Sequence, residues 1–348
     1  MTIRFADVGP SPDVFAAVMA TGVLSIVARD HRYRWLGDTL GVLATLGLLV
    51  LVVMVIVTTG LAFSGRGPVR WDLTDPDVTV RLFTFVAACA VVDTRLSSNV
   101  WVLRVLGAIG LSAWLVLAVL SARNMRAHPW AVLRDRAHGA WELASVGTSA
   151  LAIMMAALAQ QTGHRWWLAI ALPVWVAAIC IYGLMTWLIL WRTATQRHHP
   201  ALAGATFEPD SWILMGGLAI ATLAGDKIHA LAPAWLAGPV LVVTVVTWVA
   251  ATAWFPVLIY FGLRRISHGP ELLHFAGVWW ALVFPLGMYS AATYTMAAEL
   301  RQPSLVTASL VFFWDALAAW LIVVVAGLLR LSRALSPSAR TNRDARRA

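Results

Sequence analysis

The sequence predicts an all-α polytopic membrane protein with ten transmembrane helices, paired as five helical hairpins in a quasi-fivefold arrangement. Its composition, the length of its apolar segments and an internal repeat all indicate this fold class. The 348-residue chain is 60% hydrophobic and 12% charged, with a mean hydropathy of +0.76, whereas a soluble domain carries about 25% charged residues. Apolar segments of about 20 residues, the length that crosses a bilayer as a helix, recur along the chain.

The apolar segments place the membrane-spanning helices in chain order. We expect them at residues 13–29, 38–63, 79–94, 100–121, 139–159, 166–191, 210–226, 237–262, 274–297 and 304–330. With ten spans both termini lie on one side, and the loops of that side hold most of the Arg and Lys residues. This bias predicts a multi-pass protein of the cell (plasma or inner) membrane with both termini in the cytoplasm. Residues 1–335 would form one transmembrane transporter or channel domain, and residues 336–348 a basic, disordered cytoplasmic tail.

A repeat of about 65 residues relates the odd-numbered spans. Each of them opens with an aromatic residue, in order Phe15, Phe83, Trp141, Trp212 and Trp279. The odd spans are rich in small and hydroxyl residues, whereas the second span contains LLVLVVMVIV, a run suited to lipid. Small residues let helices approach closely, and hydroxyls inside a membrane face protein or water. The pattern therefore predicts that the odd helices form an inner ring that lines a central pore, although tight packing of a helix bundle would produce small-residue stripes as well.

The odd spans supply the candidate pore residues. Flexible points, where an inner helix could kink, are expected at Gly22, Gly147, Gly216 and Gly217. Hydroxyls expected to line the pore belong to Thr21, Ser25, Ser145, Thr148 and Thr222.

Two charged residues near the cytoplasmic ends of odd spans are candidate mouth charges. Arg81 would raise the local anion concentration at the third span, or anchor the topology by snorkelling. Glu142 would be a carboxylate favoured by the helix dipole in the first turn of the fifth span. It could alternatively be a protonatable group that couples protons to anions.

Several other functions are excluded or disfavoured by the motifs. No Walker A sequence is present, and HGAWE at residues 138–142 lacks the HExxH spacing of a zinc site. The net charge of +9 resides in loops and in the tail, as membrane topology requires, so it does not indicate nucleic-acid binding. Cys89 and Cys180 lie inside predicted spans, which argues against a disulfide framework. We therefore expect no enzyme activity, no metal site and no cofactor.

The run VWWALVFPLGMYS, residues 278–290, places Phe284 and Pro285 in the middle of the ninth span. A proline there removes a backbone donor and bends the helix. A membrane protein tolerates this where the backbone lines a cavity or is buried in protein. The bend could direct Phe284 into a pore, but Phe284 could equally be a core aromatic beside an ordinary proline kink.

Two stretches resemble a known family. PSPDVFAAVMATGVLSIVA in the first span and VWWALVFPLGMYSAATYTMA in the ninth are similar to the tellurite-resistance/dicarboxylate transporter family. That family includes bacterial tellurite-resistance proteins, the yeast malate permease and the plant guard-cell slow anion channels. The resemblance implies five hairpins whose odd helices line a pore, usually in a homotrimer with one pore per protomer. Phe284 matches the phenylalanine that closes the pore in this family.

The resemblance implies an anion channel or transporter in the lipid bilayer. It would move small inorganic anions or organic acids, including dicarboxylates, through a pore occluded by Phe284. Two alternatives stay open: a proton-coupled dicarboxylate (malate) or sulfite transporter, with Glu142 as the coupling group, and a tellurite-response membrane protein without transport activity.

Overall fold

The computed structural model describes residues 11–64, 71–96, 99–196, 209–268 and 279–335. The expected basic tail, residues 336–348, lies outside the described residues. Over the described ranges every regular element is a helix, which confirms the all-α class. The elements are α1 (Ala16–Asp30), α2 (Arg34–Phe63), α3 (Pro76–Arg81), α4 (Phe83–Arg95), α5 (Val100–Arg126), α6 (Trp130–Arg136), η2 (Gly139–Glu142), α7 (Leu143–Thr162), α8 (Trp166–Gln196), η4 (Pro209–Trp212), α9 (Ile213–Leu231), α10 (Ala234–His268), α11 (Trp280–Glu299) and α12 (Ser304–Leu335).

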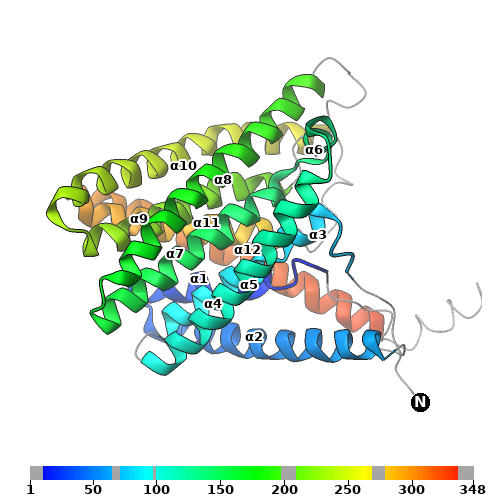
Figure 1. Cartoon of the computed structure of the whole chain (residues 1–348), viewed down its shortest axis with the longest axis horizontal. Helices are drawn as coiled ribbons and strands as arrows, with labels where there is room; N and C mark the ends of the chain where they lie inside the picture. The colour runs from blue at the N-terminus through cyan, green and yellow to red at the C-terminus, as the bar shows by residue number, and fades with distance from the viewer. Residues whose placement is uncertain (1–10, 65–70, 97–98, 197–208, 269–278, 336–348) are drawn as a thin grey trace, which may run out of the picture.

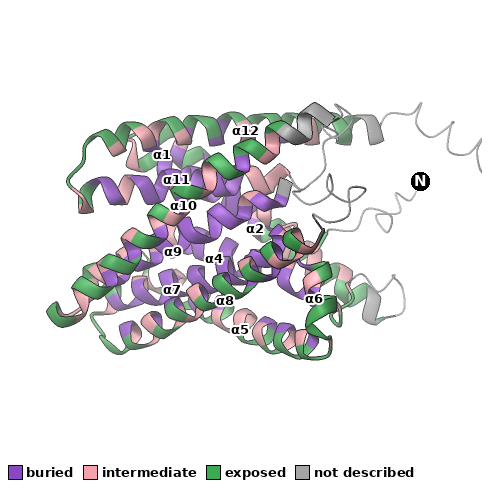
Figure 2. Cartoon of the chain, turned by 90° about the horizontal axis from the view of Figure 1, so that it is seen from above, coloured by how far each residue is buried: buried purple, intermediate pink, exposed green. Residues whose placement is uncertain are grey.

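The helices pack in consecutive pairs (Figure 1). The paired helices are α1 with α2, α4 with α5, α7 with α8, α9 with α10, and α11 with α12. The first helices of the pairs also contact one another in the cyclic order α1, α4, α7, α9, α11 and back to α1. We call these five the inner helices and their partners the outer helices. Figure 2 shows the consequence, since buried residues gather on the inner helices and exposed residues on the outer ones.

Six helical segments are long and apolar enough to cross a membrane within the described part of the chain. Five of them belong to outer helices, where only 22% to 33% of the most apolar window is buried inside the protein. The sixth, Gly139–Thr162, comprises η2 and α7 and is 94% buried. An exposed helix surface in lipid must be apolar, whereas a helix that is enclosed by protein need not be. The inner helices α1 (15 residues) and α4 (13 residues) are shorter than a full membrane span.

The predicted boundaries differ from the structure in two places. The third predicted span is divided into α3 and α4, which meet at Leu82. The short helix α6 lies in a segment that we expected to be a loop. Pro285, where we expect a bend, lies inside α11, which is continuous from Trp280 to Glu299. Pro285 lies near the helix start, where the chain loses one backbone hydrogen bond without ending the helix.

The glycines expected to be flexible points are positions of close helix contact. A Cβ atom added to Gly22 would overlap Cγ1 of Val91, and one added to Gly147 would lie 2.8 Å from Cδ1 of Phe83. The corresponding distance from Gly216 to Cγ of Pro285 is 3.0 Å, and that from Gly217 to Cδ2 of Tyr182 is 3.1 Å. The helices are continuous through these positions. The missing side chains of these four glycines bring neighbouring helices together, so close packing accounts for them without a kink, and kinks there stay a prediction.

We expect Gly22→Ala to destabilise the protein by about 1–3 kcal/mol, because the added methyl group overpacks the contact between α1 and α4. The helix propensity of alanine would by itself stabilise an exposed position. Gly183→Ala in α8 is the matched control, since nothing lies within 4 Å of a Cβ atom there. Thermal unfolding of detergent-purified protein, followed by circular dichroism, compares the two. Equal midpoints for both variants would contradict the close contact at Gly22.

Candidate functional site

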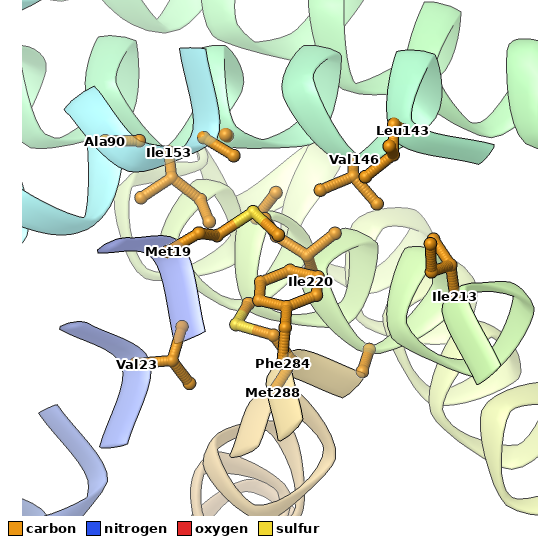
Figure 3. Close-up of a cluster of buried hydrophobic side chains, with 14 of the residues drawn as sticks. Met19, Val23, Ala90, Leu143, Val146, Ile153, Ile213, Ile220, Phe284 and Met288 are labelled. Carbon is orange, nitrogen blue, oxygen red and sulfur yellow. The ribbon is translucent and has the colours of Figure 1, made fainter. Parts of the chain in front are cut away.

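The centre of the ring of inner helices is filled by apolar side chains (Figure 3). Phe284 projects from α11 into this centre and is only 1% exposed. Around it lie Met19 of α1, Val146 of α7 and Ile220 of α9. These side chains come from four inner helices and carry no charge, and we call this buried cluster the apolar plug.

Two cavities lie along the inner helices, one towards each end. We call the cavity at their N-terminal ends the N-side cavity; it has a volume of about 40 Å³, and Asp13, Arg81 and Phe284 are among its lining residues. The C-side cavity, about 380 Å³ in volume, is lined by residues from all five inner helices, including Met288 one turn after Phe284. Each hairpin returns the chain, so the inner helices run in the same direction and the cavities face opposite ends of the ring. Phe284 and its neighbours thus lie between a narrow cavity and a wide one.

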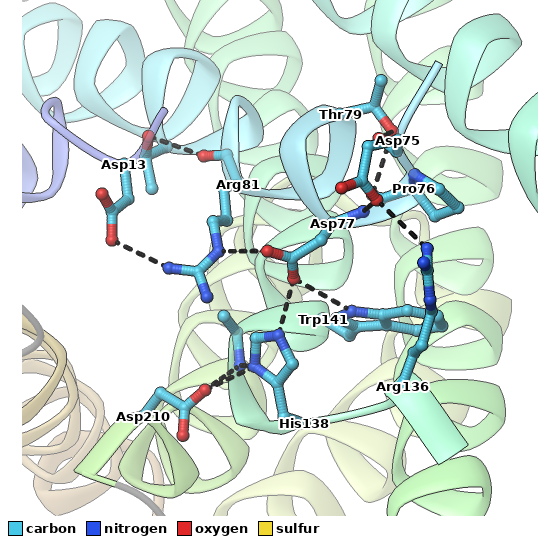
Figure 4. Close-up of polar contacts among 12 residues, drawn as sticks. Asp13, Asp75, Pro76, Asp77, Thr79, Arg81, Arg136, His138, Trp141 and Asp210 are labelled. Atoms are coloured by element: carbon cyan, nitrogen blue, oxygen red, sulfur yellow. Dashed lines mark hydrogen bonds and ion pairs between the residues drawn. The ribbon is translucent and has the colours of Figure 1, made fainter. Parts of the chain in front are cut away.

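Four helix starts are connected by a network of charged side chains at the N-side cavity (Figure 4). Arg81 forms ion pairs with Asp77 (Nε–Oδ2, 2.9 Å) and Asp13 (Nη1–Oδ2, 3.3 Å). His138 lies between two carboxylates, with Nε2 2.6 Å from Oδ1 of Asp77 and Nδ1 2.6 Å from Oδ2 of Asp210. These five residues, which we call the mouth network, connect the chain before α1, the α3–α4 segment, the start of η2 and η4.

The geometry of His138 identifies its charge state. A carboxylate accepts hydrogen bonds only, so two carboxylate partners favour the imidazolium, in which both ring nitrogens donate; the backbone N–H of Ala140, 3.3 Å from Nδ1, lies closer to Oδ2 of Asp210, at 3.0 Å. Burial alone would lower the pKa of His138, but the hydrogen bonds and charges of Asp210 and Asp77 raise it to about 9. Burial would raise the pKa of Asp77, yet the hydrogen bond and charge of His138, together with Arg81, hold it down at about 2. Sequence reasoning missed His138, because its partners are 61 and 72 residues away in the chain.

The two predicted mouth charges occupy different environments. Arg81 lines the N-side cavity and is paired there with Asp77 and Asp13. Glu142 is fully buried, its Oε1 accepts a hydrogen bond from Oγ1 of Thr186 in α8 at 2.7 Å, and it lines neither cavity. The mouth-charge interpretation of Glu142 is therefore wrong, since the side chain faces an outer helix rather than the axis of the ring.

The five hydroxyls that we expected to line a pore are also turned away from the axis. Each of them hydrogen-bonds to an outer helix, and none lines either cavity. The contacts join Thr21 to Trp320 (2.9 Å), Ser25 to Gly37 (2.6 Å), Ser145 to Ala178 (3.0 Å), Thr148 to Trp114 (2.9 Å) and Thr222 to Thr247 (2.9 Å). These hydroxyls stabilise the contacts between inner and outer helices, which corrects the pore-lining assignment. The threonines that line the cavities are Thr84 on the N-side, and Thr94 and Thr295 on the C-side.

No group of three or more His, Cys, Asp or Glu side chains within the described ranges is arranged to hold a metal ion. Of the two cysteines, Cys89 is buried and Cys180 is exposed on α8.

Comparison with known proteins adds a family relationship. The sequence model of the family described as "Voltage-dependent anion channel" (SLAC1) matches residues 10–328. The chain is also 32% identical over 146 residues to an "uncharacterized membrane protein" of Mycobacterium tuberculosis strain CDC 1551 / Oshkosh, and equally to one of strain H37Rv. Each of these alignments covers 40% of this chain and 74% of the relative. The range matched by the family model contains all five inner helices and both cavities.

Proposed function

Because the chain belongs to the voltage-dependent anion channel family, which confirms the resemblance, we propose that it is an anion channel whose pore follows the axis of the inner helices and is closed by Phe284. The observation that carries this proposal is the position of Phe284 in the apolar plug, between the N-side and C-side cavities. An ion cannot cross a dry apolar constriction of this kind until the constriction widens and is hydrated. The substrates would be small inorganic anions or organic acids.

The proposal includes ten transmembrane helices in five hairpins. The support is the cyclic contact order of the inner helices and the exposed apolar surfaces of the outer ones. The protein would reside in the cell membrane with both termini in the cytoplasm, since the loops on that side are the more basic. The N-side cavity and the mouth network would then face the cytoplasm. A homotrimer with one pore per protomer remains part of the proposal from the family resemblance.

The selectivity of such a pore for anions over cations would be weak. The inner spans have no Arg or Lys near the middle of the membrane, so no ring of fixed positive charge attracts anions there. The N-terminal ends of the inner helices converge on the N-side cavity, and their dipoles favour negative charge. Anions that release their hydration water readily, such as nitrate, would pass the apolar plug most easily.

The position of Glu142 favours a channel over a proton-coupled transporter. A coupling carboxylate must exchange protons with the transport path, whereas Glu142 hydrogen-bonds to an outer helix and lines neither cavity.

Anion flux through purified protein in liposomes tests the proposal. Chloride, nitrate, malate and sulfite are compared at fixed membrane potential, with and without a proton gradient. We expect flux of several anions down their electrochemical gradients, unchanged by the proton gradient. Flux of one acid that follows the proton gradient would instead indicate a coupled transporter, and liposomes that stay tight with every variant would indicate a protein without transport activity.

A further inference from the structure

The C-side cavity has an apolar floor and a charged rim. Val23, Ile153, Ile220 and Met288 contribute to the floor next to the plug, and Arg29, Arg95 and Lys227 belong to the rim. A volume of about 380 Å³ lies within the range of about 300–1,000 Å³ that is typical of sites for organic ligands. A single inorganic anion would leave most of this space unused.

The rim contains two guanidinium groups that share one carboxylate. Nε of Arg29 on α1 lies 2.9 Å from Oδ1 of Asp38, and Nη2 of Arg95 on α4 lies 3.2 Å from the same oxygen. Two positive charges therefore face one negative charge, and this group of three residues retains a net charge of +1. Guanidinium groups bind carboxylates strongly, often through two parallel hydrogen bonds.

Arg95 is more enclosed than Arg29, with a side chain 10% exposed against 50%. Its Nε is buried and has no hydrogen-bond partner among the described residues. A Cβ atom at Gly41 would lie 2.6 Å from this Nε, so the absence of a side chain at Gly41 is what allows the guanidinium to lie there. Nη2 of the same guanidinium is held by Asp38 and its Nε lies against Gly41 of α2, so Arg95 places a fixed positive charge at the rim.

We propose that the C-side cavity binds an amphiphilic monocarboxylate, with its carboxylate at Arg29 and Arg95 and its apolar tail on the floor beside the plug. The apolar floor favours an organic tail over a small hydrated anion as the bound ligand, and the rim cations favour a carboxylate over a neutral molecule of the same shape. The inference rests on the proposed function in one respect, since the cavity is the outer mouth of the proposed pore. A bound carboxylate would occupy the path immediately outside Phe284.

Two further carboxylates face the cavity and oppose the ligand. Asp30 of α1 and Asp226 of α9 line it, with Lys227 next to Asp226 in the chain. The C-terminal ends of the inner helices add partial negative charge. Neutralising Asp30 should therefore strengthen carboxylate binding, whereas removing a rim cation should weaken it.

Isothermal titration calorimetry of the purified full chain in detergent tests the site directly. The probes are hexanoate and benzoate, with benzyl alcohol as a neutral analogue, nitrate as a small anion, and protein-free micelles as the blank. We expect saturable binding of the two carboxylates above the blank and none of benzyl alcohol. Arg95→Gln should weaken carboxylate binding at least about tenfold, because it removes a charged hydrogen bond, while Arg104→Gln on the exposed face of α5 should leave it unchanged.

Arg95 also holds α2, so a second variant separates binding from folding. Asp30→Asn retains the shape of the side chain and should tighten benzoate binding by several-fold, a gain that misfolding cannot produce. No saturable binding to the wild type, or equal binding of benzyl alcohol and benzoate, would overturn the proposed site.

Flux measurements keep the two proposals apart. Carboxylate binding without any anion flux would support the proposed binding site and contradict the proposed channel function. Anion flux without carboxylate binding would support the proposed channel function and contradict the proposed binding site.

Discussion

Phe284→Ala is expected to increase anion flux at least about tenfold, which corresponds to a barrier lower by about 1.4 kcal/mol. The substitution removes the ring between the N-side and C-side cavities and shortens the dry segment of the axis. Because the removed group is a steric and apolar barrier, flux of chloride, nitrate and malate should all rise. The increase should not depend on a proton gradient.

The same substitution will also affect stability. Phe284 is 1% exposed, and loss of a buried phenylalanine side chain typically costs about 3–5 kcal/mol. Phe284→Leu keeps more of the buried volume, so it should raise flux less and destabilise less. Size-exclusion profiles and thermal unfolding establish that each variant is folded before its flux is compared.

Thr222→Val is the matched control for the gate. Thr222 is buried on an inner helix, but its hydroxyl bonds to Thr247 of α10 rather than facing a cavity. We expect its flux to equal that of the wild type. If folded Phe284→Ala protein conducts no more than the wild type, Phe284 is a packing residue and the axis of the ring is not the anion path.

The outer helices were predictable because lipid imposes a simple rule on them. The second predicted span, 38–63, ends at the same residue as α2 (Arg34–Phe63), and the tenth, 304–330, begins with α12. Continuous apolar sequence is required of a helix that faces hydrocarbon, so its length can be read directly. The inner helices were also located from apolar segments, whose starts at 13, 139 and 210 lie near those of α1, α7 and α9, and the repeat related them to one another.

Which face of an inner helix points to the axis could not be predicted in the same way. Gly139–Thr162 is 94% buried, so it shows no contrast between an exposed face and a buried one. A hydroxyl such as Thr148 is then compatible with a pore or with a helix contact. The indole N–H of Trp114 on α5 decides between them in the structure, and nothing in the local sequence of α7 identifies that partner.

The mouth network was beyond sequence reasoning for a related reason. Asp13 and Asp210 occur in the similar segments PDVF and PDSW, where an aspartate is typical of a helix start. In the structure their carboxylates contact Arg81 and His138 instead. Such pairings depend on how the hairpins are placed around the ring.

His138→Gln is expected to destabilise the protein by about 2–3 kcal/mol near neutral pH, because it leaves Asp77 and Asp210 facing each other without the imidazolium between them. The Asp210 side chain is only 6% exposed, so water screens its charge poorly. His164→Gln is the control, since His164 is exposed and its side chain has no partner among the described residues. Thermal unfolding in detergent provides the comparison.

The pH dependence distinguishes an imidazolium from a neutral ring. The pKa of His138 is about 9 in the folded protein against 6.5 for an ordinary histidine, so the stabilisation that its proton provides is complete below pH 6.5 and is lost as the pH rises through about 9. Asp77, whose pKa is held at about 2, contributes stability above pH 3.8 that is lost only as the pH falls towards 2. The difference in unfolding midpoint between wild type and His138→Gln should therefore be largest near pH 6 and shrink towards pH 9.5. A difference that stays constant from pH 6 to 9.5 would mean that His138 packs as a neutral side chain. In that case the mouth network would not hold the helix starts together by charge.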